Sequence, residues 1–253
     1  MKCSLPETGG YEEIASVWGD YVDWEKRRQG ENGFLTDVLR SNGCRLVLNA
    51  ALGDGCDSVY LSKEGFDVIS NEIDSCFEKI ARANAERENV KLDIRRNDWR
   101  KFDEKFEEKS FDAVVLLGNS FTMMSGSQNQ LRALSAFRNV LKPNGVLLVD
   151  ERNYLYILSQ REQILAGNWR YSKKYVYCGD KADGRPVEIS DDCVVWKIEH
   201  ENGKKAFLPA YPFKKGELRS LLQTAGFEKV EQYSDYKKGF DEGADFFQYV
   251  AAK

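Results

Sequence analysis

The chain has 253 residues, of which 42% are hydrophobic and 12% aromatic, and its formal charge is −4 at pH 7. This composition supplies enough apolar surface for a sizeable core, which excludes a disordered chain, and the interspersed charges argue against a nucleic-acid partner. The N-terminal run MKCSLPETGGYEE lacks the apolar region of a signal peptide, and no apolar run is long enough to cross a bilayer. We therefore expect a cytoplasmic protein that binds neither nucleic acid nor membrane.

Cysteine and histidine usage limits the chemistry further. The cysteines at positions 3, 44, 56, 76, 178 and 193 include no C-x-x-C pair and no disulfide-framework spacing, so free thiols are expected. The single histidine, His200, excludes a multi-histidine metal site and disfavours a Ser-His-Asp triad. We expect His200 to be an ordinary residue at a strand end, and we expect no metal.

Strands and helices alternate over the first 150 residues. Residues 11–40 predict helix, which Ser41-Asn42-Gly43 ends. Continuous apolar runs such as FDAVVLLGNS are typical of parallel strands that are buried on both faces. The alternation predicts an α/β fold with a doubly wound, Rossmann-like sheet. The expected strands are 45–50, 66–71, 91–96, 111–120 and 146–153, and the expected helices between them are 57–63, 73–87 and 131–141.

The pattern changes after residue 150. Following a helix near 154–167, residues 169–210 are rich in Tyr, Trp and Val and carry turn signals at Gly179, Asp183-Gly184 and Asn202-Gly203. This pattern predicts antiparallel strands. A helix at 216–227 and the strands EKVEQY and FFQYVAA then complete the first sheet. We divide the chain into an N-terminal helix plus α/β core (1–150), an antiparallel insertion over the carboxyl edge of the sheet (151–213) and a C-terminal part (214–253).

The segment LVLNAALGDGCDSVYLSKEGFDVISNEID, residues 46–74, joins an apolar strand to a helix through Gly53 and Gly55. The two glycines permit a tight turn and a close approach of the backbone to a ligand. Glu72 ends the next strand, where a carboxylate can accept hydrogen bonds from both hydroxyls of a ribose. Strand, glycine turn, helix and acid together predict a site for an adenosine-containing ligand.

Two residues of the turn separate the candidate ligands. A dinucleotide fingerprint has a third glycine where this chain has Ser58, and Asp57 puts negative charge where a pyrophosphate would lie. S-adenosylmethionine contains adenosine without phosphate, so the turn favours it. Asp98-Trp99 fits the same ligand, because an indole can stack on adenine while a carboxylate accepts from its amine. An NAD-dependent oxidoreductase is the alternative from another class.

Several further runs carry a family resemblance: LGNSF (117–121), LKPNGVLLVDERNYLYIL (141–158) and AYPF (210–213). With the glycine turn, they resemble the glycine N-methyltransferase family of class I S-adenosylmethionine-dependent methyltransferases. The sequence is most like the members that methylate glycine and sarcosine in betaine synthesis. The resemblance implies S-adenosylmethionine as cofactor, S-adenosylhomocysteine as product, a small amino acid as substrate and a role in making an osmoprotectant. It leaves the oligomeric state open.

The resemblance also implies individual contacts. Arg28 would pair with the cofactor carboxylate, and Arg27 is the alternative one position away; Asn119 and Arg152 would bind the substrate carboxylate, which arginine grips through two parallel hydrogen bonds. The implied cofactor residues are Trp18, Arg28, Ala51, Gly53, Glu72, Asp98, Trp99 and Leu117. The implied catalytic residues are Tyr11 near the transferred methyl group, Asn119 and Arg152 at the substrate, and Tyr177 and Tyr211 closing over it.

Asn49 departs from the family pattern, which usually has an acid at this position. An amide can form hydrogen bonds but cannot offset the charge of the cofactor's ammonium group. A non-catalytic S-adenosylmethionine-binding protein is therefore an alternative. Within the family, a sarcosine/dimethylglycine N-methyltransferase is the other alternative, because the sequence does not show the volume of the substrate pocket.

Overall fold

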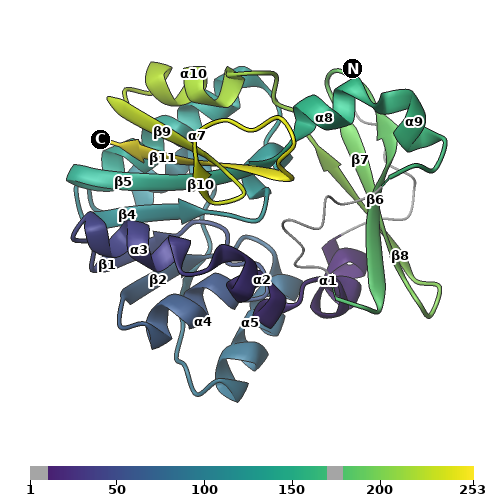
Figure 1. Ribbon diagram of the computed structural model, residues 1–253. Coiled ribbons are helices and arrows are strands. Elements are labelled where there is room, and N and C mark those ends of the chain that lie inside the picture. The colour runs from purple at the N-terminus through teal and green to yellow at the C-terminus, as the bar shows by residue number, and fades with distance from the viewer. Residues whose placement is uncertain (1–10, 170–178) are drawn as a thin grey trace.

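The computed structural model describes residues 11–169 and 179–253 (Figure 1). It contains an eight-stranded sheet in the order β10-β9-β11-β5-β4-β1-β2-β3, in which β5, β4, β1, β2 and β3 run parallel. The strand β11 is antiparallel to both β5 and β9. The predicted Rossmann-like sheet is thus confirmed. Its strands are β1 (Leu46–Asn49), β2 (Asp67–Asn71), β3 (Asp93–Arg95), β4 (Phe111–Leu116), β5 (Leu141–Arg152), β9 (Lys229–Ser234), β10 (Lys237–Lys238) and β11 (Phe246–Ala252).

The N-terminal helical region is divided into α1 (Tyr11–Tyr21), α2 (Trp24–Glu31) and α3 (Phe34–Ser41). Asp23 caps α2 by accepting a hydrogen bond from the backbone N–H of Lys26, and Asn32 and Gly33 adopt left-handed conformations that end it. The other helices are α4 (Cys56–Lys63), α5 (Ser75–Arg87), η1 (Trp99–Lys101), α6 (Phe102–Lys105), η2 (Ser120–Met123), α7 (Ser127–Val140), α8 (Tyr154–Ser159), α9 (Arg161–Leu165) and α10 (Glu217–Thr224).

The central strands bury side chains on both faces of the sheet. Alternate residues of a strand point to opposite faces, so Leu48 and Val114 pack with α7 and α10, whereas their neighbours Val47 and Val115 pack with α3 and α4. These four side chains have no solvent exposure. Burial on both faces explains the continuous apolar runs in the sequence and rigidly positions the carboxyl ends of β1, β2 and β4.

The three-stranded antiparallel sheet consists of β6 (Ala182–Ile189), β7 (Val194–His200) and β8 (Lys205–Ala210). Figure 1 shows this sheet beside the large one, with α1 packed against it. The turn predicted at Asn202-Gly203 joins β7 to β8. The turn predicted at Asp183-Gly184 is wrong, because both residues lie inside β6 and pair with Glu199 and Ile198 of β7.

The single histidine ends β7, as expected, and connects the small sheet to α1. Its Nδ1 accepts from the backbone N–H of Asn202 (3.1 Å), so Nε2 carries the proton and donates to Asp20 of α1 (3.1 Å). Cys44, Cys56 and Cys76 are free thiols. The expectation of free thiols is wrong for Cys193, which is disulfide-bonded.

Candidate active site

The glycine turn is held by the acid that follows β2. One carboxylate oxygen of Glu72 accepts from the backbone N–H of Gly53 and the other from that of Asp74, both at 2.9 Å. Gly53 and Gly55 have positive φ angles, and a Cβ on Gly55 would lie 3.3 Å from Ala81 of α5. Burial raises the pKa of the Glu72 carboxyl, although the two backbone hydrogen bonds oppose this. Glu72 therefore fixes the turn and also faces the pocket beside it.

Ser58 takes the place of the third glycine of a dinucleotide fingerprint, and its hydroxyl forms hydrogen bonds within the protein. The Ser58 Oγ accepts from the Asn49 side-chain amide (2.9 Å) and forms a hydrogen bond with the Ser70 hydroxyl (2.9 Å). The Asn49 carbonyl oxygen accepts from the backbone N–H of Ala51. All three polar side chains are buried. Asn49, the departure from the family pattern, thus belongs to a hydrogen-bonded network that links β1, α4 and β2.

Asp57 does not present an uncompensated charge at the turn. It forms ion pairs with Arg27 (2.9 Å) and Arg28 (2.5 Å), and both arginines also pair with Glu31. Burial alone would raise the pKa of Asp57, but the two guanidinium groups outweigh it and hold that pKa below its usual value. Asp57 therefore presents no unpaired negative charge that would oppose a pyrophosphate, whereas Ser58 still stands where a dinucleotide fingerprint has its third glycine.

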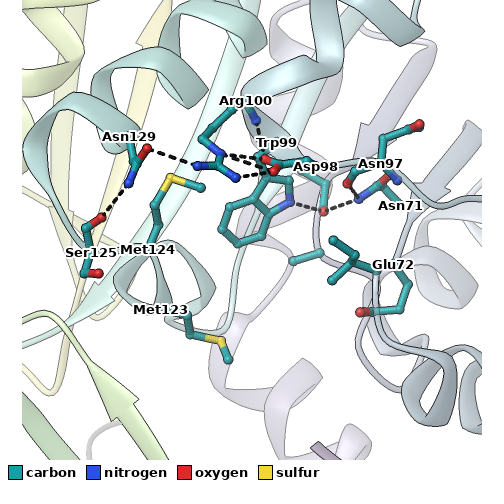
Figure 2. A pocket seen from close by; sticks show the side chains of 13 residues that line it. Asn71, Glu72, Asn97, Asp98, Trp99, Arg100, Met123, Met124, Ser125 and Asn129 are labelled. Carbon is teal, nitrogen blue, oxygen red and sulfur yellow. Dashed lines mark hydrogen bonds and ion pairs between the residues drawn. The ribbon is translucent and has the colours of Figure 1, made fainter. Parts of the chain in front are cut away.

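A cavity of about 340 Å³ lies at the carboxyl ends of β1, β2 and β3. The Trp99 indole donates its N–H to the Ala50 carbonyl (2.7 Å), which fixes the plane of the ring. Figure 2 shows this indole between Met124 on one side and Glu72 on the other. The cavity is lined by Ala50, Ala51, Asn71, Glu72, Ile73, Asn97, Asp98, Trp99, Arg100, Met123, Met124, Ser125 and Asn129.

Asp98 lines the same cavity with both carboxylate oxygens engaged. They accept from the Arg100 guanidinium at 2.5 to 3.1 Å, and Oδ1 also accepts from the Arg100 backbone N–H. These hydrogen bonds lower the pKa of Asp98. Arg100 also donates to Asn129, which lies on the side of Arg100 away from Asp98 in Figure 2. A ligand amine at Asp98 would share the carboxylate with Arg100.

A second polar centre surrounds Arg152 at the end of β5. Its Nη2 donates to the Tyr21 hydroxyl (3.1 Å), and its guanidinium lies over the rings of Trp196 (4.2 Å) and Phe246 (4.9 Å). Arg152 is 6% exposed. Aromatic faces attract a guanidinium, and together with Tyr21 they set its orientation. The arrangement is that of an anion-binding group enclosed by aromatic walls.

Asn119 lies beside this centre in a left-handed turn after β4. Its backbone N–H and that of Gly118 donate to the buried Asp150 carboxylate (2.6 and 3.0 Å). Burial raises the pKa of Asp150 to about 6. The Asn119 amide donates to the Tyr154 hydroxyl (2.8 Å), and its oxygen accepts from the Arg152 backbone N–H (2.9 Å). Asn119 therefore holds the backbone that carries Arg152.

Besides Arg28, Asn119 and Arg152, the residues expected at the site fall into three groups. Ala51, Glu72, Asp98 and Trp99 line the cavity, with Gly53 tied to it through Glu72. Trp18 packs edge-on against Tyr21 and Phe77, Leu117 packs in the core on the α3 and α4 face, and the Tyr211 hydroxyl donates to Glu217. Tyr11 begins α1, and Tyr177 lies outside the described residues.

Sequence reasoning missed the residues that enclose Arg152. Tyr21 could have been found, because it lies three positions after Trp18 and therefore on the same side of α1. Trp196 and Phe246 gave no local signal, since each reads as an ordinary residue of an apolar strand. Ile73, Met123 and Met124 of the cavity were also missed, because single apolar residues outside the strands carry no distinguishing pattern.

Residues 11–169 and 179–253 contain no cluster of three or more His, Cys, Asp and Glu side chains arranged to hold a metal ion. No helix in this part of the chain is long and apolar enough to span a membrane.

Comparison with known proteins adds independent evidence. Residues 47–145 match the family model of a methyltransferase domain. The glycine/sarcosine N-methyltransferase of Halorhodospira halochloris is 34% identical over 239 residues, covering 93% of this chain and 85% of the relative. That of Aphanothece halophytica is 32% identical, with 96% and 89% covered. An S-adenosylmethionine-dependent methyltransferase structure from Clostridium acetobutylicum superposes with a TM-score of 0.73 at 17% identity, covering 96% of this chain and 98% of that one.

Proposed function

Because the chain belongs to the glycine/sarcosine N-methyltransferase family, we propose that it methylates the nitrogen of glycine and of sarcosine. The observation that best supports this proposal is the buried Arg152, whose guanidinium is fixed by Tyr21 and by aromatic rings at the carboxyl edge of the sheet. A small amino acid offers a carboxylate to such a group and leaves its amine for reaction. The products, sarcosine and dimethylglycine, are precursors of the osmoprotectant betaine, and we place the reaction in the cytoplasm.

The cavity fits the adenosine of S-adenosylmethionine. Trp99 offers a flat ring of fixed orientation for adenine, and Glu72 offers a carboxylate for the ribose hydroxyls. The methionine part of the cofactor would be held near the turn after β4, where Arg27 is better placed than Arg28. The Arg27 Nη1 lies 4.0 Å from the position of a Cβ on Gly118, whereas the Arg28 guanidinium stacks on Tyr60 at 4.5 Å. We therefore assign the cofactor carboxylate to Arg27 in place of Arg28.

Arg152 is proposed to bind the substrate carboxylate, with Trp196 and Phe246 limiting how far the guanidinium can turn. Asn119 acts on the same group through the backbone, because its oxygen fixes the Arg152 N–H. The segment 151–213 is proposed as a lid, since its small sheet contributes Trp196 and packs on α1. Tyr11, Tyr177 and Tyr211 remain proposed substrate contacts from the family resemblance.

S-adenosylmethionine, when bound, supplies a methyl group on a sulfonium, which is already a good leaving group. The contribution of the protein is therefore to hold the amine in line with that methyl group and to exclude water. Arg152 fixes one end of the substrate, so its nitrogen points away from the guanidinium. The buried aromatic residues around Arg152 keep water from this centre. The amine can lose its proton before or during binding, so no strong general base is needed.

The test is transfer of labelled methyl groups from S-adenosylmethionine to glycine, sarcosine and dimethylglycine, each supplied alone, with the products separated. Transfer to glycine and sarcosine is the expected result. Transfer to sarcosine and dimethylglycine without glycine would replace the proposal by the alternative specificity. Binding of S-adenosylmethionine without transfer to any of the three would indicate a binding protein, and NADH binding would indicate an oxidoreductase.

A further inference from the structure

A glycine in the middle of β6 needs an explanation. Gly184 pairs with Ile198 of β7, and its φ angle is not in the left-handed region. Glycine weakens a strand interior because it adds conformational freedom to the unfolded chain and offers no side chain for packing. Since the backbone conformation does not require glycine here, the reason must lie in what approaches the strand.

Tyr21 of α1 occupies the space that a side chain on Gly184 would take. A Cβ at this position would lie 2.5 Å from the Tyr21 hydroxyl oxygen, 2.7 Å from Cε2 and 2.8 Å from Cζ. These distances are well below the optimum of roughly 3.5–4.0 Å for non-bonded carbon atoms. Tyr21 is 3% exposed, and its hydroxyl accepts the hydrogen bond from Arg152. The absence of a side chain at position 184 therefore lets the Tyr21 hydroxyl reach Arg152.

The backbone of Gly184 also connects to the opposite wall of the Arg152 site. Its carbonyl accepts from the Trp169 indole N–H (3.1 Å). The Trp169 ring packs edge-on against Trp196 with centroids 5.4 Å apart, and Trp196 lies under the Arg152 guanidinium at 4.2 Å. Two chains of contacts thus lead from one strand residue to Arg152, one through Tyr21 and the other through Trp169 and Trp196.

We propose that Gly184 is a positioning residue for the amine substrate, which sets the orientation of the Arg152 guanidinium through Tyr21 on one side and Trp196 on the other. This inference rests on the proposed role of Arg152 in binding the substrate carboxylate. In this proposal the small sheet not only covers the site but also orients Arg152. The strand β6 fixes how far α1 and β7 stand from the end of β5, and hence the direction in which Arg152 presents its donors.

The test is Gly184→Ala, with Gly19→Ala as a matched control. Both variants add one methyl group, but a Cβ on Gly19 of α1 would meet nothing within 4 Å. Gly184→Ala is expected to raise the KM for glycine and sarcosine about tenfold, because Arg152 loses its hydrogen bond to Tyr21. The Kd for S-adenosylmethionine should change less than twofold. Gly19→Ala should leave both quantities unchanged. An unchanged amine KM in Gly184→Ala would overturn the proposal.

A double-mutant cycle with Tyr21→Leu separates positioning from general damage to the fold. Tyr21→Leu removes the hydroxyl together with the ring atoms that a Cβ at position 184 would meet, and it should itself raise the amine KM. If Gly184 acts through Tyr21, Gly184→Ala should raise the amine KM less in the Tyr21→Leu background than in the wild type. Equal effects in the two backgrounds would overturn the proposal. Where Gly184→Ala alone does not fold, a rise of about tenfold in the amine KM from Tyr21→Leu to the double variant would overturn it.

Arg152→Ala distinguishes failure of this inference from failure of the proposed function. If Arg152→Ala leaves the amine KM unchanged, the assignment of Arg152 to the substrate carboxylate fails. If Arg152→Ala raises the amine KM but Gly184→Ala does not, only the positioning role of Gly184 fails.

Discussion

The cavity beside Trp99 and the centre around Arg152 share one edge of the sheet but are built differently. The cavity is made from segments that follow β1, β2, β3 and β4. Its key side chains are fixed by backbone groups: Glu72 by two N–H groups and Trp99 by a carbonyl. Arg152 is instead held by side chains from α1, β7 and β11. A site of the first kind depends on local turns, whereas a site of the second kind depends on how distant elements pack.

The largest expected effect is on the free energy of unfolding. On the Arg152 side of the molecule, β5 buries two consecutive acids, Asp150 and Glu151. Burial raises the pKa of Glu151 from 4.5 to about 8, with Glu217 and Asp150 adding to the effect and a hydrogen bond from Tyr249 opposing it. Between these two values the folded state holds a proton that the unfolded state has lost, so stability falls as pH rises. Glu151→Gln should remove this part of the slope and stabilise the protein at pH 8 by a few kcal/mol.

Urea unfolding between pH 4.5 and 8 measures this effect. Asp98→Asn is the control from the cavity side, because the Asp98 side chain is 27% exposed and its hydrogen bonds to Arg100 lower its pKa. It should leave the slope in this range nearly unchanged. Identical slopes for wild type and Glu151→Gln would show that Glu151 is already ionised in the folded protein.

Arg152→Ala should separate the two sites functionally. Removal of a two-pronged, charge-assisted contact is expected to weaken glycine and sarcosine binding by about 100-fold. The Kd for S-adenosylmethionine should stay within about twofold, a range that corresponds to less than 0.5 kcal/mol. Titration calorimetry with each ligand measures both quantities, and Arg152→Lys should be intermediate because it keeps the charge without the fork. Equal losses of affinity for the amine and for S-adenosylmethionine would contradict the assignment of the two ligands to separate sites.

Trp99→Leu should give the opposite pattern. Loss of a stacking surface for adenine is expected to weaken cofactor binding by about 10-fold or more, given roughly 1–3 kcal/mol per stacked base. The amine KM at saturating cofactor should not change. Trp169→Leu is the reciprocal control, because Trp169 supports Trp196 and should affect the amine KM alone. The comparison fails if the two substitutions affect both ligands alike.

The smallest expected effect distinguishes Arg27 from Arg28 as the residue that binds the cofactor carboxylate. Both pair with Asp57, so each is replaced by lysine to retain a positive charge beside that carboxylate. Arg27→Lys should raise the Kd for S-adenosylmethionine about fivefold through loss of the guanidinium fork. Arg28→Lys should leave it within about twofold, since the Arg28 guanidinium lies against Tyr60. A larger loss in Arg28→Lys would return the cofactor carboxylate to Arg28.

The same contrast explains what could be predicted from the sequence. The parallel strands, the glycine turn and Glu72 follow from local patterns, because hydrophobic period and turn chemistry act over a few residues. The dipeptide Asp183-Gly184 predicts a turn, but Gly184 lies inside β6, and the reason for a glycine there is Tyr21, which is 163 positions earlier in the chain. Trp196 and Phe246 likewise acquire their role only when the two sheets come together.

The hydrogen-bonded network around Ser58 has a consequence for attempts to redesign cofactor preference. Replacing Ser58 by glycine would recreate the three-glycine pattern of dinucleotide-binding proteins but would deprive Asn49 and Ser70 of their buried partner. Each buried polar group left without a partner costs about 1–3 kcal/mol of folding free energy. Ser58→Gly would therefore destabilise the protein whether or not a dinucleotide binds. A successful exchange would have to replace all three side chains together, which makes the choice of cofactor resistant to single substitutions.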